Sequence, residues 1–203
     1  MRFALPLLCA SLLGFSAVVA AADTLHGITE DGRKVLLAPN GTWTFDNSTA
    51  SAASVAPGGS PYIPMVKKFS VNYDVNSWNQ SPPKDGESAT KRMFMHKTLP
   101  LYAVVISDQI PANNASMREV ILHNVQSAGA TPTIILEKKP VINGKEAGMI
   151  RFVASLKGLD FVFNTNYYGD DSGNIQVTCY TGQSLFYKYE AECQKFIDGL
   201  TIK

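Results

Sequence analysis

The sequence carries little charge and almost no excess of one sign. Lys and Arg number 18 and Asp and Glu number 17, so only 17% of the residues are charged. A nucleic-acid surface needs a clustered basic stripe that neutralises several phosphates. Here the lysines come in isolated pairs, at Lys67-Lys68 and Lys138-Lys139. The composition therefore predicts no nucleic-acid partner.

Histidine is scarce, and the positions of its three copies argue against a simple metal site. His26, His96 and His123 stand far apart, and none follows a metal-binding spacing such as His-x-x-x-His. The oxygen-rich run at residues 170–174 lacks the glutamate that closes a calcium loop, and it stands where a hairpin turn is required. We predict neither a metal site nor a cofactor, and we expect His123 to be a solvated surface residue.

Catalytic motifs are also missing. The sequence contains no phosphate loop and no dinucleotide fingerprint. Residues 182–186 begin like a nucleophile elbow, but the closing glycine is absent and the preceding strand belongs to an antiparallel pattern. Carboxylate pairs cannot be placed from the sequence, so glycoside hydrolysis is neither supported nor excluded. No catalytic residue is predicted.

The long apolar run of the sequence stands at its N-terminus. Within residues 1–22, Arg2 is the only charge, residues 5–19 are mostly apolar, and Ala20-Ala21-Ala22 supplies the small residues that a signal peptidase needs. This pattern predicts a signal peptide that is cleaved before Asp23. The mature chain is then expected to be periplasmic or secreted.

The alternative is an uncleaved anchor, because a run of about 20 apolar residues can span a bilayer. Pro6, Gly14 and the alanine-rich end of the leader favour cleavage. After cleavage, 17 basic and 17 acidic residues remain. No later run is long enough to cross a membrane, so we expect no stable membrane insertion of the mature chain.

Cysteine is rare, and two of its three copies remain after cleavage. Cys179 ends a strand pattern at residues 175–179 that alternates apolar and polar residues, and Cys193 lies on the apolar stripe of a predicted helix. Both sulfurs therefore face inward, and we predict a disulfide between them, since exported thiols oxidise and stay oxidised. The alternatives are two separate buried thiols or a redox-active pair, which the absence of a Cys-x-x-Cys spacing disfavours.

Residues 23–46 predict a small three-stranded β-meander. Asp31-Gly32 and Asn40-Gly41 separate three short strand patterns, and both dipeptides favour two-residue hairpin turns. A unit of this size is well below the roughly 40 residues at which a fold usually holds together alone. We therefore expect this β-hairpin module to lean on another surface.

The predicted meander has one apolar face. Val35 and Leu37 share a face of the second strand, and Trp43 and Phe45 share a face of the third. These four residues are the candidate partner-binding residues, because exposed apolar patches of this kind often mark interaction sites. The alternative, that the face packs on its own domain, stays equally open.

The rest of the chain divides into a linker and an α+β domain. Residues 47–61 consist almost entirely of Ser, Ala, Thr, Gly and Pro, which predicts a flexible linker. Beyond it, strand patterns dominate and two helix patterns stand far apart, so the class is α+β, an antiparallel sheet covered by helices. The predicted ranges are a signal peptide at residues 1–22, a β-hairpin module at 23–46, a flexible linker at 47–63 and an α+β domain at 64–203.

Within this domain, three strands joined by tight turns predict an antiparallel meander at residues 148–156, 159–168 and 174–180. Ser116 and Glu119 form a capping box that predicts the start of the first helix. The apolar stripes predicted for the two helices are Met117, Val120, Ile121, Val125 and Ala128 for the first, and Leu185, Tyr189, Cys193, Phe196 and Leu200 for the second.

These C-terminal patterns carry a family resemblance. Residues 141–147, the strands through Tyr168, the segment at residues 173–181 and the helix at 186–200 together resemble the PsbP-like fold shared with DcrB-type bacterial envelope proteins. The resemblance covers about residues 65–203 and concerns element order, which is a fold-level signal. It implies an α/β/α sandwich used for protein binding, assembly or chaperoning. The hairpin module and the paired cysteines depart from what we expect of that family.

The sequence therefore favours an exported, non-enzymatic protein-binding or adaptor protein of the bacterial cell envelope, with an envelope protein as its partner. The alternative is a periplasmic hydrolase whose site is built from loops such as residues 79–90, since long polar loops commonly carry function.

Overall fold

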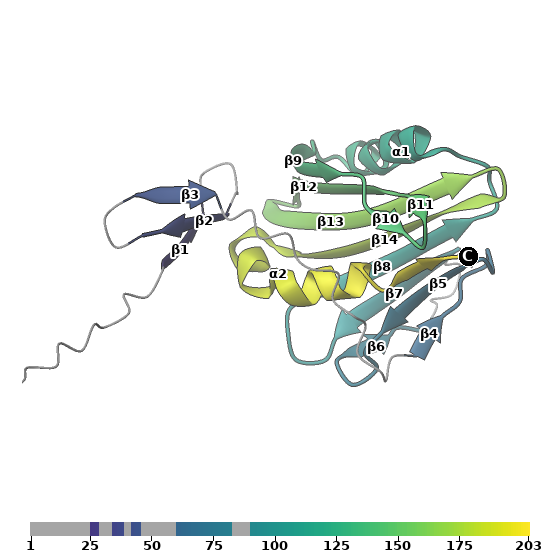
Figure 1. Cartoon of the computed structure of the whole chain (residues 1–203), viewed down its shortest axis with the longest axis horizontal. Helices are drawn as coiled ribbons and strands as arrows, with labels where there is room; N and C mark the ends of the chain where they lie inside the picture. Colours follow the sequence, from purple (N-terminus) through teal and green to yellow (C-terminus); the bar gives the residue numbers. More distant parts are fainter. Residues whose placement is uncertain (1–24, 29–33, 39–41, 46–59, 83–89) are drawn as a thin grey trace, which may run out of the picture. The chain divides into compact units, whose positions relative to one another are not determined.

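The computed structural model describes residues 25–28, 34–38, 42–45, 60–82 and 90–203 (Figure 1). The predicted signal peptide and most of the predicted linker lie outside these residues. The chain divides into two compact units, residues 1–48 and 49–203. Neither helix in the described residues has the length and apolar character needed to span a bilayer.

The N-terminal unit contains three short antiparallel strands in the order β1-β2-β3. The backbone amide of Ala38 donates to the carbonyl oxygen of Thr42 at 2.8 Å, across the segment that holds Asn40-Gly41. This bond continues the β2–β3 ladder toward the turn, as an antiparallel hairpin requires. The strands are β1 (Leu25–Ile28), β2 (Lys34–Leu37) and β3 (Trp43–Phe45).

The C-terminal unit is built around a seven-stranded sheet in which every described neighbour pair is antiparallel. Together with two helices, this sheet makes the unit an α+β fold, in agreement with the class predicted from the sequence. In sheet order the strands are β6 (Trp78–Gln80), β7 (Lys91–His96), β8 (Tyr102–Asp108), β14 (Gly173–Gly182), β13 (Leu159–Asp170), β12 (Gly148–Leu156) and β9 (Thr133–Lys138).

The turns that join the central strands follow from local sequence. Lys157 and Gly158 connect β12 to β13 with φ values of 53° and 78°. Two consecutive positive φ angles define the hairpin turn whose twist matches that of the flanking strands. A second hairpin, between β10 (Val141–Ile142) and β11 (Lys145–Glu146), turns at Asn143 and Gly144 in the same way.

A small second sheet, in the order β15-β5-β4, lies on the same core as α2. Its strands are β15 (Leu200–Ile202), β5 (Phe69–Tyr73) and β4 (Ser60–Tyr62). Two expectations change here. Residues 60–63 fell in the predicted linker, yet β4 pairs with β5 from Ser60 onward. Leu200 was expected on the last helix but lies in β15, where it pairs with Val71.

Helix α1 (Asn114–Ser127) starts earlier than the predicted capping box. Asn113 is the N-cap, and its side-chain oxygen accepts a hydrogen bond from the backbone amide of Ser116 at 2.8 Å. Ser116 is therefore capped and does not itself cap, because asparagine satisfies free first-turn amides as well as serine does. The buried face of α1 is also rotated about the helix axis relative to the predicted stripe. Val120 is 47% exposed, whereas Leu122, which was not on the predicted stripe, is buried.

Helices α1 and α2 (Gln183–Ile197) pack on opposite faces of the large sheet. On β12, Phe152 belongs to the cluster formed with α1, whereas its neighbour Arg151 bonds to Glu190 of α2. Successive residues of a strand point to opposite faces, so one strand serves both helices.

The predicted disulfide is present in the structure. Cys179 of β14 and Cys193 of α2 are bonded, their Cα atoms lie 5.5 Å apart, and both residues are fully buried. Of the predicted apolar stripe of α2, Cys193 and Phe196 are buried, while Leu185 and Tyr189 are only half-buried. Phe186 and Ile197 are the buried residues that the stripe missed.

Candidate functional site

A row of apolar side chains crosses five strands of the large sheet in exact cross-strand register. Phe152 of β12 is opposite Phe163 of β13, and Phe163 is opposite Tyr180 of β14. Tyr180 is opposite Tyr102 of β8, and Tyr102 is opposite Met95 of β7. Directly opposed residues share a face of the sheet. We call these five residues the aromatic row.

The rings of the aromatic row are stacked on one another. The centroids of Phe152 and Phe163 are 5.1 Å apart, those of Phe163 and Tyr180 5.2 Å, and those of Tyr102 and Tyr180 5.6 Å. The corresponding interplanar angles are 13°, 23° and 26°. Offset stacked pairs contribute about 0.5–1.5 kcal/mol each beyond the burial of their area. The stacked rings therefore support one another along the row.

The aromatic row is covered at one end and open at the other. Phe152 is 2% exposed and packs in one cluster with Met117 and Ile121 of α1. At the other end, Tyr102 is 38% exposed and Met95 is 47% exposed. Helix α1 packs on β12 and β13, so the open end lies on the strands at the other side of the sheet.

The strand residues beside the open end are largely uncharged. The next register row on the same face consists of Met93, Val104 and Thr178. Among the described residues of β7, β8 and β14 on this face, the charged ones are Lys91 and Asp108, which lie toward the other end of these strands. The strand surface around the open end is therefore mostly uncharged.

The Tyr180 hydroxyl of the row adds no charge at neutral pH. Burial raises the pKa of Tyr180, and the neighbouring Tyr102 acts in the same direction. Both effects favour the protonated, uncharged phenol.

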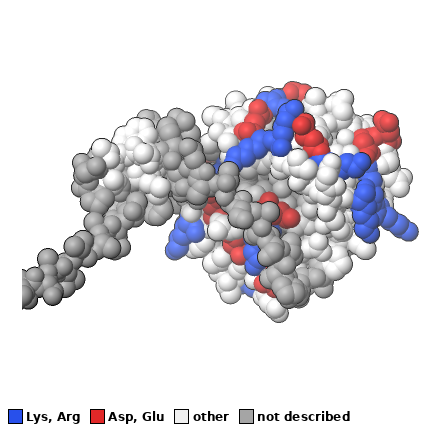
Figure 2. All heavy atoms as spheres, in the orientation of Figure 1, with Lys and Arg blue, Asp and Glu red and all other residues white. Residues whose placement is uncertain are grey.

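Figure 2 shows that, on the face in view, basic and acidic side chains of the C-terminal unit stand next to one another.

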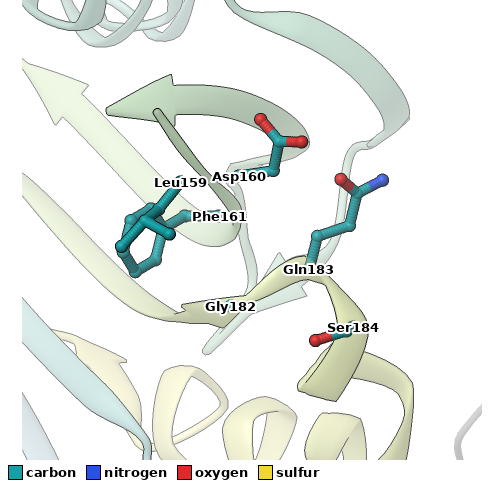
Figure 3. Close-up of a pocket in the computed structure, with 6 residues that line it drawn as sticks. All are labelled: Leu159, Asp160, Phe161, Gly182, Gln183 and Ser184. Atoms are coloured by element: carbon teal, nitrogen blue, oxygen red, sulfur yellow. The ribbon is translucent and has the colours of Figure 1, made fainter. Parts of the chain in front are cut away.

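A shallow cleft of about 490 Å³ adjoins the aromatic row where β13 begins and α2 starts (Figure 3). Phe161 joins it to the row, because its ring centroid lies 6.3 Å from those of Phe163 and Tyr180. Phe161 is paired with Gly182, and nothing lies within 4 Å of the position that a Cβ at residue 182 would occupy. The lining residues are Leu159, Asp160, Phe161, Gly182, Gln183 and Ser184.

The cleft is lined by apolar and uncharged polar residues and by one carboxylate, that of Asp160. Figure 3 shows Leu159 and Phe161 together, with Gln183 and Ser184 across from them at the start of α2. Asp160 accepts a hydrogen bond from the Ser155 hydroxyl. The described lining residues include a serine hydroxyl but no histidine or lysine to activate it.

A buried polar network lies under α2, on the other face of the sheet. Nη2 of Arg151 donates to Oε1 of Glu190 at 2.9 Å, and the guanidinium carbon lies 4.9 Å from the ring centroid of Phe186. Nδ2 of Asn164 donates to Oε1 of Gln194 at 2.9 Å. We call the contacts around Arg151 and Glu190 the polar seat of α2. These polar contacts occupy part of the interface between α2 and the sheet where the sequence predicted an apolar stripe.

The network continues to the end of α2. Nε2 of Gln194 donates to Oδ1 of Asp198 at 2.8 Å, and Nδ2 of Asn166 donates to the carbonyl oxygen of Ile197 at 3.1 Å. Burial raises the pKa of Asp198, although the hydrogen bonds from Gln194 and Asn166 act in the opposite direction. The contacts position α2 and do not open to a described cleft.

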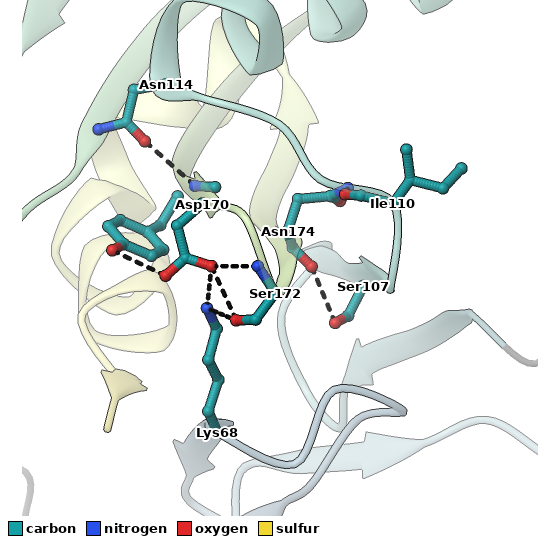
Figure 4. A network of polar contacts seen from close by, with 9 residues as sticks. Lys68, Ser107, Ile110, Asn114, Asp170, Ser172 and Asn174 are labelled. Carbon is teal, nitrogen blue, oxygen red and sulfur yellow. Dashed lines mark hydrogen bonds and ion pairs between the residues drawn. The ribbon is translucent and has the colours of Figure 1, made fainter.

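The turn between β13 and β14 holds a second polar cluster (Figure 4). Lys68 donates to the Asp170 carboxylate and to the Ser172 hydroxyl. Asp170 also accepts from the Tyr168 hydroxyl at 3.2 Å and from the Ser172 backbone amide at 2.9 Å. The oxygen-rich run at residues 170–174 therefore forms a hairpin turn whose first carboxylate is paired with an ammonium group. The Lys68 ammonium also lies 4.7 Å from the ring centroid of Phe69.

This cluster predicts a measurable pH dependence of stability. The hydrogen bond from Lys68 holds the pKa of Asp170 well below its usual range. A carboxyl whose folded-state pKa is depressed stabilises the fold above its unfolded-state pKa, and this contribution is lost as pH falls through the folded-state value. Because the Asp170 side chain is 40% exposed, we expect Asp170→Asn to cost about 1 kcal/mol or less at neutral pH.

Urea unfolding of the mature chain at neutral pH and at about pH 3 tests this expectation. Asp170→Asn is expected to destabilise at neutral pH and to bring the two free energies of unfolding closer together. Asp171→Asn, a change at the exposed next residue of the same turn, is the matched control. An equal effect of both substitutions would show that the Lys68 pairing does not contribute.

The candidate partner-binding residues from the sequence lie in the other unit. The register pairs Val35 with Phe45 and Leu37 with Trp43. Val35 is 6% exposed and Trp43 is 54% exposed, whereas the side chains of Leu37 and Phe45 lie outside the described part. Whether these four residues bind a partner stays a prediction.

The loop proposed for a hydrolase site lies partly outside the structure as described. Residues 78–80 form β6, and residues 83–89 are not among the described residues. His123 is exposed, with Nε2 3.3 Å from the Ser127 hydroxyl. In the described part of the chain, no three His, Cys, Asp or Glu side chains come together as a metal would require.

The aromatic row was not predicted from the sequence. Phe161 and Phe163 are two positions apart on a predicted strand, and Tyr180 ends another. The sequence therefore indicated which of these residues share a face of their own strand. The sequence did not indicate the register that aligns them with Tyr102 and Met95, because this register depends on the order of strands in the sheet.

Comparisons with known proteins define the class of fold. No family model and no curated protein matches this sequence. The fold is similar to that of cyanobacterial PsbP (CyanoP) from Synechocystis, with 10% sequence identity and a TM-score of 0.55 over 77% of this chain and 99% of that chain. The C-terminal resemblance to PsbP-like proteins that the sequence indicated is confirmed at the level of the fold.

Two further solved structures are more distant. The Ran-binding protein Mog1p of Saccharomyces cerevisiae is 6% identical, with a TM-score of 0.49 over 71% of this chain and 95% of that chain. A protein from Bacteroides thetaiotaomicron is 11% identical, with a TM-score of 0.47 over 71% of this chain and 48% of that chain.

Proposed function

We propose that this chain is an exported, non-enzymatic protein-binding or adaptor protein of the bacterial cell envelope, and that its C-terminal unit is an α/β/α sandwich of the PsbP type. The observation that carries the proposal is the open end of the aromatic row. Tyr102 and Met95 expose apolar surface that is held in place by stacked neighbours. Apolar and aromatic surface that is ordered before binding is typical of protein-interaction sites.

The location rests on the leader and on the cysteines. The apolar, small-residue end of residues 1–22 supports export. The bonded pair Cys179 and Cys193 supports an oxidising compartment, since disulfides are rare in the cytosol. The N-terminal meander, with Trp43 exposed, is proposed as a second docking element.

The partner is proposed to present an uncharged, apolar surface to the open end. A charge placed there would have to be desolvated on binding, which costs far more than the loss of one apolar contact. We therefore expect Met95→Glu to weaken the complex by at least about tenfold, the equivalent of 1.4 kcal/mol. Tyr102→Glu is expected to act in the same direction.

The test is photo-crosslinking in living cells through an unnatural residue at position 102. The expected result is a crosslink to one envelope protein that is lost in the Met95→Glu variant. Val120→Glu on α1 is the matched control, because Val120 and Met95 are both 47% exposed. A crosslink that survives Met95→Glu, or that Val120→Glu removes equally, would contradict the proposal. Recovery of the chain from the cytosol with residues 1–22 intact would contradict export.

A further inference from the structure

The ring of His96 holds the turn between β7 and β8. Its Nδ1 accepts hydrogen bonds from the backbone amides of Thr98 at 3.2 Å and of Leu99 at 3.0 Å. A ring nitrogen accepts only when it carries no proton, so the proton of the neutral ring is on Nε2. The His96 side chain is 7% exposed, so few waters can replace these bonds.

The other side of the ring faces a carboxylate. Nε2 of His96 lies 3.9 Å from Oε1 of Glu192 on α2, and the same oxygen accepts from Nε1 of Trp78 at 3.2 Å. Trp78 is paired with His96 across β6 and β7, and their ring centroids are 5.1 Å apart. The orientation of the ring is therefore determined from two sides.

Other charged groups surround this pair. Nζ of Lys195 on α2 lies 4.0 Å from Oε2 of Glu192. On the turn itself, Nζ of Lys97 donates to the carbonyl oxygen of Val75 at 2.7 Å. Asp74 lies before β6, and hydrogen bonds from Ser77 and Asn76 lower its pKa. Glu192 is thus the carboxylate that faces Nε2, and Lys195 is its cationic neighbour.

A second proton on this ring can bind only at Nδ1, because Nε2 already carries one. Nδ1 would then become a donor that faces two backbone N–H donors, and both hydrogen bonds to the turn would be lost. The positive ring would at the same time be attracted to Glu192, 3.9 Å from Nε2. Protonation therefore favours the contact with α2 and removes both ring hydrogen bonds to the turn, while the backbone bonds from His96 to Leu101 and from Lys97 to Ser77 remain.

The turn that loses these two bonds adjoins the open end of the aromatic row. Met95 precedes His96 on β7, Tyr102 follows the turn on β8, and these two residues form the last pair of the β7–β8 ladder. The turn is held from its other end by Thr181, whose hydroxyl donates to the carbonyl oxygen of Pro100 at 2.6 Å. Thr98 lies three positions after Met95 and Leu99 three positions before Tyr102, so a change at these two amides occurs beside the open end.

We propose that His96 is a pH-sensitive latch: neutral, it holds the amides of Thr98 and Leu99 through Nδ1, and protonated, it releases these two amides and alters the Met95–Tyr102 end of the aromatic row. Histidine is the side chain whose charge changes between about pH 5 and pH 8. The latch itself depends only on the contacts of His96. Its effect on partner binding rests on the function proposed above.

The test is NMR of the full mature chain, without a partner, titrated from about pH 8 to about pH 5. The imidazole nitrogen signals at the high end are expected to report the Nε2–H form. On acidification, the Thr98 and Leu99 amide protons are expected to shift upfield along one curve with the His96 ring. A proton on Nδ1 at high pH, or amides that do not follow the ring, would overturn the latch.

His96→Asn is the informative variant, because the asparagine oxygen takes the place of Nδ1 as an acceptor but does not gain a proton in this range. The amide signals of Thr98 and Leu99 are expected to keep chemical shifts typical of the hydrogen-bonded turn and to lose their pH dependence. His123→Asn, which removes an exposed histidine, is expected to leave the titration unchanged. Persistence of the shifts in His96→Asn would assign them to another group and reject the proposal.

The Met95 methyl signal tests the connection to the binding surface. It is expected to shift on the same titration curve. If the amides titrate and the Met95 methyl does not, the coupling is rejected while the protein-binding function is unaffected. Conversely, a crosslink from position 102 that survives Met95→Glu rejects that function without changing this titration.

Discussion

Replacing Arg151 with methionine is expected to lower the free energy of unfolding by about 3–5 kcal/mol, since breaking a buried ion pair leaves an uncompensated charge behind. The Arg151 side chain is 9% exposed and that of Glu190 is 16% exposed. Their bond at 2.9 Å joins the central sheet to α2. Methionine keeps the length of the arginine stem, so the loss measures mainly the charge that remains on Glu190.

Urea unfolding of the mature chain measures this effect, and two variants serve as controls. The double variant Arg151→Met with Glu190→Met is expected to recover most of the loss, because replacing both partners of a buried pair by apolar residues is often neutral. Arg118→Met removes the Arg118 ion pairs with Glu119 and Glu137, in which the arginine side chain is 32% exposed. It is expected to cost at most about 1 kcal/mol. Equal losses for Arg151→Met and Arg118→Met would show that the buried pair has no special role.

Removing the disulfide is expected to cost about 3 kcal/mol, the value that the chain-entropy account assigns to a closed loop of 15 residues. Cys179 and Cys193 are 14 positions apart and both are fully buried. The oxidised and reduced wild-type chains, compared by urea unfolding with and without reductant, isolate the crosslink from any change of side-chain volume. The reduced chain is expected to unfold at lower urea.

Thiol titration provides the complementary control. Without reductant, the denatured mature chain is expected to show no free sulfhydryl, whereas two separate buried thiols would show two. A reduced chain as stable as the oxidised one would mean that the bond adds nothing to the packing of α2 on β14.

Local sequence was sufficient for much of the fold. The strand predicted at residues 148–156 is β12 with the same bounds. The pair Lys157-Gly158 predicted the following hairpin, and its positive φ angles bear this out. The bond between Cys179 and Cys193 was predicted from the faces on which the two residues lie.

Errors arose where a long-range contact outweighed a local preference. Leu200 continues the helical spacing of α2, yet pairing with Val71 places it in a strand. Leu185 and Tyr189 were expected in the core but are only half-buried. The polar seat around Arg151 and Glu190 occupies part of the interface between α2 and the sheet. Local patterns do not show which residues arrive from distant segments, so they cannot decide such cases.

The sequence by itself determined the central strands, the turns between them and the cysteine pairing, because these depend on neighbours within a few residues or on the faces of one strand and one helix. Only the tertiary structure decided the candidate site. The alignment of Phe163, Tyr180, Tyr102 and Met95 requires the order of four strands and their register, and the open end exists because α1 packs on β12 and β13. The contact of His96 with Glu192 likewise joins segments 96 positions apart, which only the packing of α2 on the sheet brings together.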